Sequence, residues 1–125
     1  MEKLHLVGTE DTPEVLLDPS SNKFVISGRS LPEDVTTFYQ PIMDWLDALE
    51  NNPLSAIKFD IKLEYFNTAS SKLILDILMK LEEIHTSGAC KINIVWHYQE
   101  DDEDMQEAGD EYKDLVEVPF EIVAY

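Results

Sequence analysis

Hydroxyl-bearing residues gather at one point of this chain, where positions 67–71 read Asn-Thr-Ala-Ser-Ser. Before them, residues 57–65 alternate apolar and polar side chains, as a strand does, and after them residues 73–84 repeat apolar side chains at helical spacing. The hydroxyls therefore fall where a strand gives way to the first turn of a helix. Backbone N–H groups in that turn lack intrahelical partners, and the helix dipole is positive there. A hydroxyl at this point can cap the helix, or it can carry a phosphate, because the position favours an anion.

The elements that position this cluster follow from the spacing of apolar residues. Strands are predicted at residues 4–6, 15–17, 23–27, 57–65, 92–98 and 118–125. Helices are predicted from a capping box at Ser30–Glu33 to residues 51–53, with a kink or a new start at Pro41, then over residues 73–84 with Gly88 as C-terminal cap, and over residues 105–115. This alternation indicates an α/β fold in a single domain, residues 1–125, with a mixed sheet flanked by helices.

Composition and charge exclude several classes of function. The net charge is −17, and residues 99–125 carry eleven acidic residues against one lysine, whereas residues 56–98 carry five of each sign. Nucleic acid and anionic membranes are poor partners for such a chain, because phosphate contacts need Lys and Arg. No apolar run approaches the roughly 20 residues that span a bilayer, and the first residues, Met1–His5, do not have the pattern expected of a signal peptide. A single cysteine excludes an internal disulfide, so we expect a cytoplasmic protein that binds a partner protein most easily at the neutral middle segment.

Other polar residues do not form a catalytic or metal site in the sequence. Asp60 and Glu64 share one face of a predicted strand, but four residues of strand separate them by roughly 13 Å. A carboxylate pair around a glycosidic bond is about 5–10 Å apart, so these two residues are expected in a solvated or lysine-paired stripe. The three histidines lack metal-ligand spacing. The run Glu100–Asp104 lacks the alternating ligands and central glycine of an EF-hand loop. We expect no enzymatic activity, no metal and no cofactor.

The strand, the Asn67-Thr68 corner and the following helix resemble STAS domains, the fold of anti-sigma-factor antagonists. Those domains carry a phosphorylatable Ser or Thr at the N-terminus of the helix after a central strand. Their usual corner reads Asp-Ser-Ser-Gly, whereas Asn67 stands here in place of the acid and no glycine follows Ser71. This chain also ends on a predicted strand where those domains end on a helix.

A narrower bacterial family, the SiaC-type biofilm regulators, resembles this chain over nearly its whole length. The order and spacing of several short motifs carry the resemblance: Gly8-Thr9, Thr12-Pro13, Gly28–Glu33, Phe38-Tyr39 with Pro41, Trp45-Leu46, Asn67–Ser71, Asp76–Leu78, and Trp96 with Tyr98. The resemblance implies a non-enzymatic switch in cyclic-di-GMP signalling. The threonine that matches Thr68 is phosphorylated by a serine/threonine protein kinase and dephosphorylated by a PPM-type phosphatase, and the unphosphorylated form binds and activates a diguanylate cyclase.

With this resemblance, we favour Thr68 as the phosphorylation site, with Ser70 and Ser71 in reserve. The expected partner-binding residues are Asn67, Thr68, Ala69, Ser70, Ser71 and Lys72. A second hypothesis is a constitutive acidic module that binds a basic protein through residues 99–117. Salt separates the two, because a partner held by the acidic segment should weaken steeply as salt rises, and one held at Thr68 should respond mainly to phosphorylation.

Overall fold

The computed structural model describes residues 1–52 and 54–125, which form a six-stranded sheet and three helices. In chain order the elements are β1 (Leu4–Leu6), β2 (Glu14–Asp18), β3 (Lys23–Ser30), α1 (Val35–Asn51), β4 (Ala56–Phe66), α2 (Thr68–Ser87), β5 (Lys91–Tyr98), α3 (Glu103–Leu115) and β6 (Phe120–Ala124). The prediction of a mixed sheet with helices is confirmed. None of the helices in the described part is both long and apolar enough to cross a membrane.

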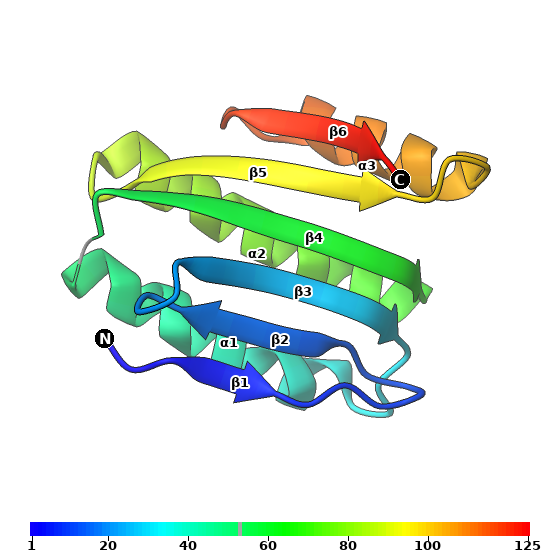
Figure 1. Cartoon of the computed structure of the whole chain (residues 1–125), viewed down its shortest axis with the longest axis horizontal. Helices are drawn as coiled ribbons and strands as arrows, with labels where there is room; N and C mark the ends of the chain where they lie inside the picture. The colour runs from blue at the N-terminus through cyan, green and yellow to red at the C-terminus, as the bar shows by residue number, and fades with distance from the viewer. Residues whose placement is uncertain (53) are drawn as a thin grey trace.

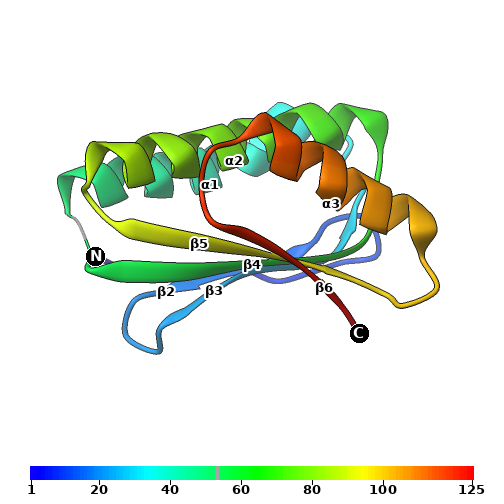
Figure 2. The same ribbon diagram turned by 90° about the horizontal axis from the view of Figure 1, so that it is seen from above.

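The strands lie in the sheet in the order in which they occur in the chain, and this order puts all three helices on one face (Figure 1). β1, β2 and β3 form an antiparallel meander, and β3, β4, β5 and β6 run parallel. Each parallel step passes through one helix to the next strand in the same direction. Since such crossovers are right-handed, steps in one direction place every helix on the same side. Figure 2 shows the consequence, a helix layer on one face of the sheet and an open face opposite.

The hydrophobic core lies between the sheet and the helix layer. β4 shows why, because Ile57, Phe59, Ile61 and Leu63 are buried under the helices while the residues between them point to the open face. Facing them are the buried residues of the helices, Ile42, Leu46 and Leu49 from α1 and Ile74, Ile77, Leu78, Leu81 and Ile84 from α2. Strand alternation and helical spacing thus meet in one layer, as the sequence indicates.

α3 approaches the sheet closely because it has a glycine at the contact. A Cβ atom on Gly109 would lie 2.5 Å from Cδ1 of Trp96, so only glycine lets the indole ring pack against the helix. The Trp96 side chain is completely buried, and its Nε1 donates a hydrogen bond to the carbonyl of Met105, 3.0 Å away. Tyr112 and Phe66 pack on the same ring. This aromatic cluster holds α3 beside the end of β4.

The predicted start of α1 is wrong by four residues. The helix begins at Val35, and Asp34 caps it by accepting hydrogen bonds from the backbone N–H of Thr37 at 3.2 Å and from its hydroxyl at 2.8 Å. Ser30, the expected cap, is instead the last residue of β3, where its hydroxyl is buried and bonded elsewhere. No new start occurs at Pro41, which lies inside the helix.

Elsewhere the predicted elements are confirmed with small shifts of their ends. α1 ends at Asn51 as expected, and Pro53, the last residue of the predicted stop, lies outside the described residues. Gly88 caps α2 in the left-handed conformation with φ of 81°. β3 runs three residues further than predicted, and the last strand is shorter. Cys90 is buried as expected, and burial raises the pKa of its thiol.

A bulge near the end of β4 reverses the expected orientation of its last two residues. The pairing with β3 shifts between Gly28 and Arg29, so that Leu63 lies opposite Gly28 and Tyr65 opposite Arg29. Tyr65, which alternation places in the core, is therefore 45% exposed with the Arg29 guanidinium 5.5 Å from its ring. Phe66 turns inward in its place. The bulge thus brings an aromatic ring under the corner at which α2 begins.

Candidate functional site

The Asn67–Lys72 corner lies at the carboxyl end of β4, the end of the sheet at which the parallel strands β3 and β5 also finish (Figure 1). The backbone N–H of Asn67 donates to the carbonyl of Ser30, 3.1 Å away. Its side chain caps α2, since Oδ1 accepts a hydrogen bond of 2.8 Å from the N–H of Ser70. The loop between β1 and β2 closes on the same end, where the N–H of Leu31 donates to the carbonyl of Asp11 at 2.7 Å. The predicted helix cap and the predicted hydroxyl cluster therefore occupy one rigid junction.

A buried chain of hydroxyl groups ties this junction to α1. The Ser70 hydroxyl donates to the carbonyl of Ser30 at 3.1 Å and accepts from the Ser30 hydroxyl at 2.8 Å. Because Ser30 uses its hydrogen toward Ser70, the contact of 2.6 Å between Ser30 Oγ and Tyr39 Oη needs the tyrosine as donor. Burial raises the pKa of the Tyr39 hydroxyl, so this donor keeps its proton. Each of the three hydroxyl hydrogens, those of Tyr39, Ser30 and Ser70, therefore has an acceptor. These hydrogen bonds hold the first turn of α2 against β3 and α1.

The three hydroxyls of the cluster have different surroundings. The Ser70 side chain has no exposed surface, so the expectation that it lies on a partner-binding surface does not hold. Ser71 is half-buried, and its hydroxyl donates to the carbonyl of Thr68 at 2.6 Å. Thr68 is exposed, and within residues 1–52 and 54–125 its hydroxyl has no hydrogen-bond partner. Thr68 is therefore the hydroxyl that an outside enzyme can reach in the folded chain.

The remaining expected contact residues divide in the same way. Ala69 and Lys72 are exposed, whereas Asn67 is half-buried and uses its side chain as the cap. Thr68 and Lys72 are one helical turn apart, so their side chains lie on the same face of α2. The exposed residues at this corner are thus Thr68, Ala69 and Lys72.

The chemistry available to Thr68 is that of an acceptor for a transferred group. It is the first residue of α2, and the N–H groups of Thr68 and Ala69 have no acceptor among the described residues. Those donors and the helix dipole favour a negative charge at this point. In the same part of the chain no His, Asp or Glu side chain is hydrogen-bonded to the Thr68 hydroxyl, and a nucleophile needs such a base. The geometry suits a residue modified by another enzyme.

The acidic segment, residues 99–117, reaches the same end of the molecule through β5. Asp102 caps α3 by accepting a hydrogen bond of 3.0 Å from the N–H of Met105, and two further acids fill the first turn, where the helix dipole favours them. A cavity of about 310 Å³ is lined both by this segment and by Glu64–Phe66 at the end of β4. The two surfaces that the sequence offers as alternatives are therefore neighbours. No group of three possible metal ligands is present among the described residues.

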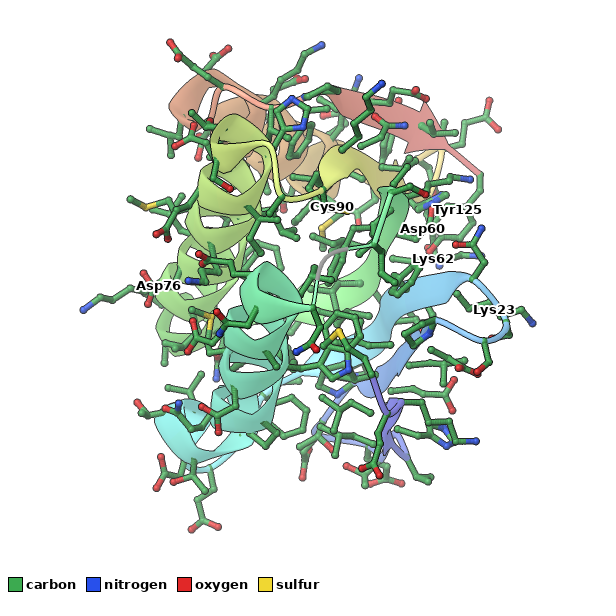
Figure 3. The ribbon with its side chains drawn as sticks, turned by 90° about the vertical axis from the view of Figure 1, so that its left-hand side faces the viewer. Lys23, Asp60, Lys62, Asp76, Cys90 and Tyr125 are labelled. Carbon is green, nitrogen blue, oxygen red and sulfur yellow. The ribbon has the colours of Figure 1, made fainter. Side chains whose placement is uncertain are left out.

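The expected stripe on β4 lies on the open face of the sheet, far from a catalytic arrangement. Asp60 is 3.8 Å from the ammonium of Lys58, as expected, and 2.8 Å from Nε2 of His97, which the sequence did not indicate. Lys62 lies over the ring of Tyr125 with 4.3 Å between the ammonium and the ring centroid. Figure 3 shows Asp60, Lys62 and Tyr125 on the sheet side of the molecule and Asp76 on the helix side. These pairs cover one sheet face and do not meet the Thr68 corner.

Sequence reasoning missed the two residues that hold the corner in place, Ser30 and Tyr39. Ser30 lies 40 residues before Ser70, so no local spacing joins them. The available signal was compositional, because a serine at the end of an apolar strand and a tyrosine on the core face of a helix each need a buried partner.

Comparison with known proteins gives matches over almost the entire length. A family model described as "SiaC family regulatory phosphoprotein" matches residues 6–125. The crystal structure of apo-SiaC from Pseudomonas aeruginosa is similar with a TM-score of 0.89 and 31% identity, covering 99% of this chain and 100% of that one. A chain in the crystal structure of the diguanylate cyclase SiaD in complex with its activator SiaC, from the same organism, gives a TM-score of 0.90 and 31% identity over 98% and 99% of the two chains. The curated protein PA14_02130 of P. aeruginosa strain UCBPP-PA14 is 31% identical over 125 residues, 100% of this chain and 98% of that protein.

Proposed function

This chain belongs to the SiaC family of regulatory phosphoproteins, and we propose that it is a phosphorylation-controlled activator of a diguanylate cyclase. The unphosphorylated chain binds and activates the cyclase in the cytoplasm. A serine/threonine protein kinase adds a phosphate to Thr68, and a PPM-type phosphatase removes it. The observation that carries the proposal is an exposed Thr68 at the first position of a capped helix, in a fold similar to that of SiaC bound to its cyclase. The chain itself performs no catalysis.

The fold tolerates a phosphate at Thr68. A phosphate adds about −1.5 to −2 charges, and at this position it meets unpaired N–H groups and the positive end of the dipole of α2. The buried hydroxyl chain lies on the other side of the first turn, so the modification does not break it. The phosphorylated chain therefore keeps its structure.

The partner does not tolerate the same group. A surface that packs against a neutral threonine would have to desolvate a dianion and accommodate three more oxygens. Burying an uncompensated charged group costs at least a few kcal/mol, and each 1.4 kcal/mol is about tenfold in affinity. A loss of a hundredfold or more in affinity for the cyclase is therefore expected.

The test uses a serine/threonine kinase, a PPM-type phosphatase and a diguanylate cyclase from the organism that encodes this chain. After incubation with kinase and ATP, mass spectrometry locates the phosphate, and calorimetry measures cyclase binding before and after modification. Thr68→Ala should bind the cyclase and resist phosphorylation, and Thr68→Asp should bind less well. Thr86→Ala is the matched control, because Thr86 is an exposed threonine at the other end of α2.

Two results would end this proposal. The first is phosphate found only outside Thr68, and the second is unchanged cyclase binding after complete modification of Thr68. Nucleotide turnover by the purified chain in the absence of its partners would contradict the non-enzymatic role. Binding that weakens steeply with salt but ignores phosphorylation would favour the alternative, a constitutive module that acts through the acidic segment.

A further inference from the structure

β6 is the outermost strand of the sheet on the side of α3, and one of its two backbone edges faces no other strand (Figure 1). The hydrogen bonds to β5 show which residues use the other edge. Tyr125 donates its N–H to the carbonyl of Tyr98 and accepts from the N–H of Glu100, both at 2.9 Å. Backbone groups of successive strand residues point to opposite edges, so the odd-numbered residues of β6 bond to β5. The residues that point N–H and C=O to the free edge are Phe120, Ile122 and Ala124, and in the described part of the chain no loop or side chain bonds to them.

This edge lacks the features that usually protect an edge strand. Native edge strands are very short, or carry Lys, proline or a bulge, because an unprotected edge pairs with another chain. β6 has neither Lys nor proline, and its pairing with β5 has no shift of register. β1, at the opposite edge of the sheet, is only three residues long and directly follows Lys3. β6 is therefore the edge that is open to a further strand.

The side chains of β6 on the open sheet face leave apolar surface exposed. Val123 is 38% exposed and Tyr125 is 43% exposed, and strand alternation puts both on the same face as Glu121. On the other face Phe120 and Ile122 belong to the core. A strand added beside β6 would cover Val123 and Tyr125, because side chains directly opposite each other on neighbouring strands are in contact.

The charges around this edge select the kind of strand that fits. Residues 99–125 carry eleven acids against Lys113, and the exposed Glu117 and Glu121 flank the start of β6. A second copy that paired its own β6 with this one would bring two such segments together, and their like charges would repel. A segment with Lys or Arg would be attracted. Lys62 lies over the ring of Tyr125 at the other end of the strand, so the basic residues fit best at the start of β6.

From these features we infer that β6 receives an extended, basic segment of a partner protein, which pairs with it as an additional strand of the sheet. The backbone of this segment bonds to the free N–H and C=O groups of β6. Its side chains place Lys or Arg opposite Glu121 and an apolar group opposite Val123. The site goes beyond the proposed switch, because it lies at the edge of the sheet and needs no contact with Thr68.

Hydrogen exchange of the backbone amides, followed by NMR, tests the pairing directly. The probe is a peptide of about six residues, the usual length of a strand, in which valine and arginine alternate and both ends are blocked. In the free chain the amides of Glu121 and Val123 should be protected by β5, and the outward amides of β6 should exchange fast. When about nine-tenths of the chain has bound peptide, exchange at Phe120, Ile122 and Ala124 should slow about tenfold, with Glu121 and Val123 unchanged.

Two variants test the backbone and the charge separately. Ala124→Pro removes one outward N–H and keeps the bonds to β5, so the melting temperature should stay close to that of the wild type. Peptide binding should weaken about fivefold, as expected for one hydrogen bond. Glu121→Lys should weaken binding at low salt and favour a peptide with glutamate in place of arginine. Glu14→Lys is the matched control, the same change on β2, and it should bind within about twofold of the wild type.

Several outcomes would overturn the inference. One is no binding of the basic peptide, and another is binding that leaves the three outward amides of β6 unprotected. A third is a wild-type dimer that Ala124→Pro converts to monomer, since a second copy would then occupy the edge. If Ala124→Pro lowers the melting temperature, the exchange pattern and Glu121→Lys decide.

The Thr68 corner provides the control that separates this inference from the proposed function. Thr68→Ala and the chain phosphorylated at Thr68 should both bind the peptide as the wild type does. Peptide pairing at β6 together with cyclase binding that ignores phosphorylation would leave the edge site standing and end the proposed switch. A working switch in a chain whose β6 amides the peptide never protects would do the opposite.

Discussion

Substitution of Ser70 by alanine should weaken the fold more than any other single change in the buried hydroxyl chain. In the wild-type protein this hydrogen-bonded series of hydroxyls has three hydrogens and three acceptors, the last acceptor being the carbonyl of Ser30. Without the Ser70 oxygen, Ser30 and Tyr39 have two hydrogens and only each other as acceptor, so one hydrogen is left buried and unbonded. Leaving a buried donor unsatisfied costs about 1–3 kcal/mol. Alanine regains about 0.5 kcal/mol of helix propensity, and we expect a net loss of about 2 kcal/mol.

Substitution of Tyr39 or Ser30 should lower stability less, because the remaining hydroxyl groups can still form hydrogen bonds with one another. In Tyr39→Phe, Ser30 still donates to Ser70, and Ser70 still donates to the carbonyl. In Ser30→Ala, the Tyr39 hydroxyl, which also interacts with Ser70, can donate to the Ser70 oxygen. No hydrogen is stranded in either variant, so each should lose about 1 kcal/mol or less, the net contribution of one ordinary hydrogen bond.

Urea unfolding of the three variants, followed by tryptophan fluorescence, measures this order. For a chain of this size a loss of 1 kcal/mol lowers Tm by about 4 °C, so Ser70→Ala should melt about 8 °C below the wild type. Equal or greater losses for Ser30→Ala or Tyr39→Phe would refute the proton assignment. Under the proposed function, Ser70→Ala should also remain a full substrate of the kinase, since Ser70 is buried and the proposed site is the exposed Thr68.

Two further predictions concern the helix layer. Gly109→Ala should lower stability by about 2 kcal/mol despite the better helix former, because its Cβ would lie 2.5 Å from Cδ1 of Trp96; near-UV circular dichroism should report the displaced indole. Lys80 contacts Glu50 on α1 and lies 2.9 Å from Asp47, and these hydrogen bonds raise its pKa above the ordinary 10.5. The contribution of Lys80 to stability is therefore complete below pH 10.5 and lost as the pH rises through the raised pKa, so the difference in urea midpoint between wild type and Lys80→Met should be constant near pH 7 and shrink at strongly alkaline pH.

The placement of all three helices on one face of the sheet could be predicted in part from the sequence. Parallel strands buried on both faces read as continuous apolar runs, whereas residues 57–65 alternate. Alternation in a strand between two helices therefore already indicates an open face. The strand order was not available, because no local signal states that each crossover moves to the next position in the same direction. Given that order, the handedness of the crossovers decides the rest.

The errors at Ser30 and Tyr65 have the same physical origin. Ser30-Leu31-Pro32-Glu33 satisfies the local pattern of a capping box, but a buried contact 40 residues away offers the serine hydroxyl better partners. Asp34 then provides the cap. At Tyr65 a bulge in the pairing with β3 shifts the alternation by one residue. In both places tertiary contacts override a local rule, and both lie beside the Thr68 corner.

The proposed switch at this corner would act on the partner and not on the fold. The Ser70 hydroxyl holds the first turn of α2 from inside, and Thr68, the proposed acceptor of the phosphate, is exposed on the outside of the same turn. A phosphate added outside meets unpaired N–H groups that stabilise it, and the internal contacts give it no way to loosen the turn. The phosphate should therefore change the free energy of binding of a partner that packs against Thr68, and not the free energy of folding. Tyr112 also holds this turn, because its hydroxyl donates a hydrogen bond to the carbonyl of Ser71. A rigid corner suits the proposed switch, since it keeps a phosphate on Thr68 at the surface where the partner is proposed to bind.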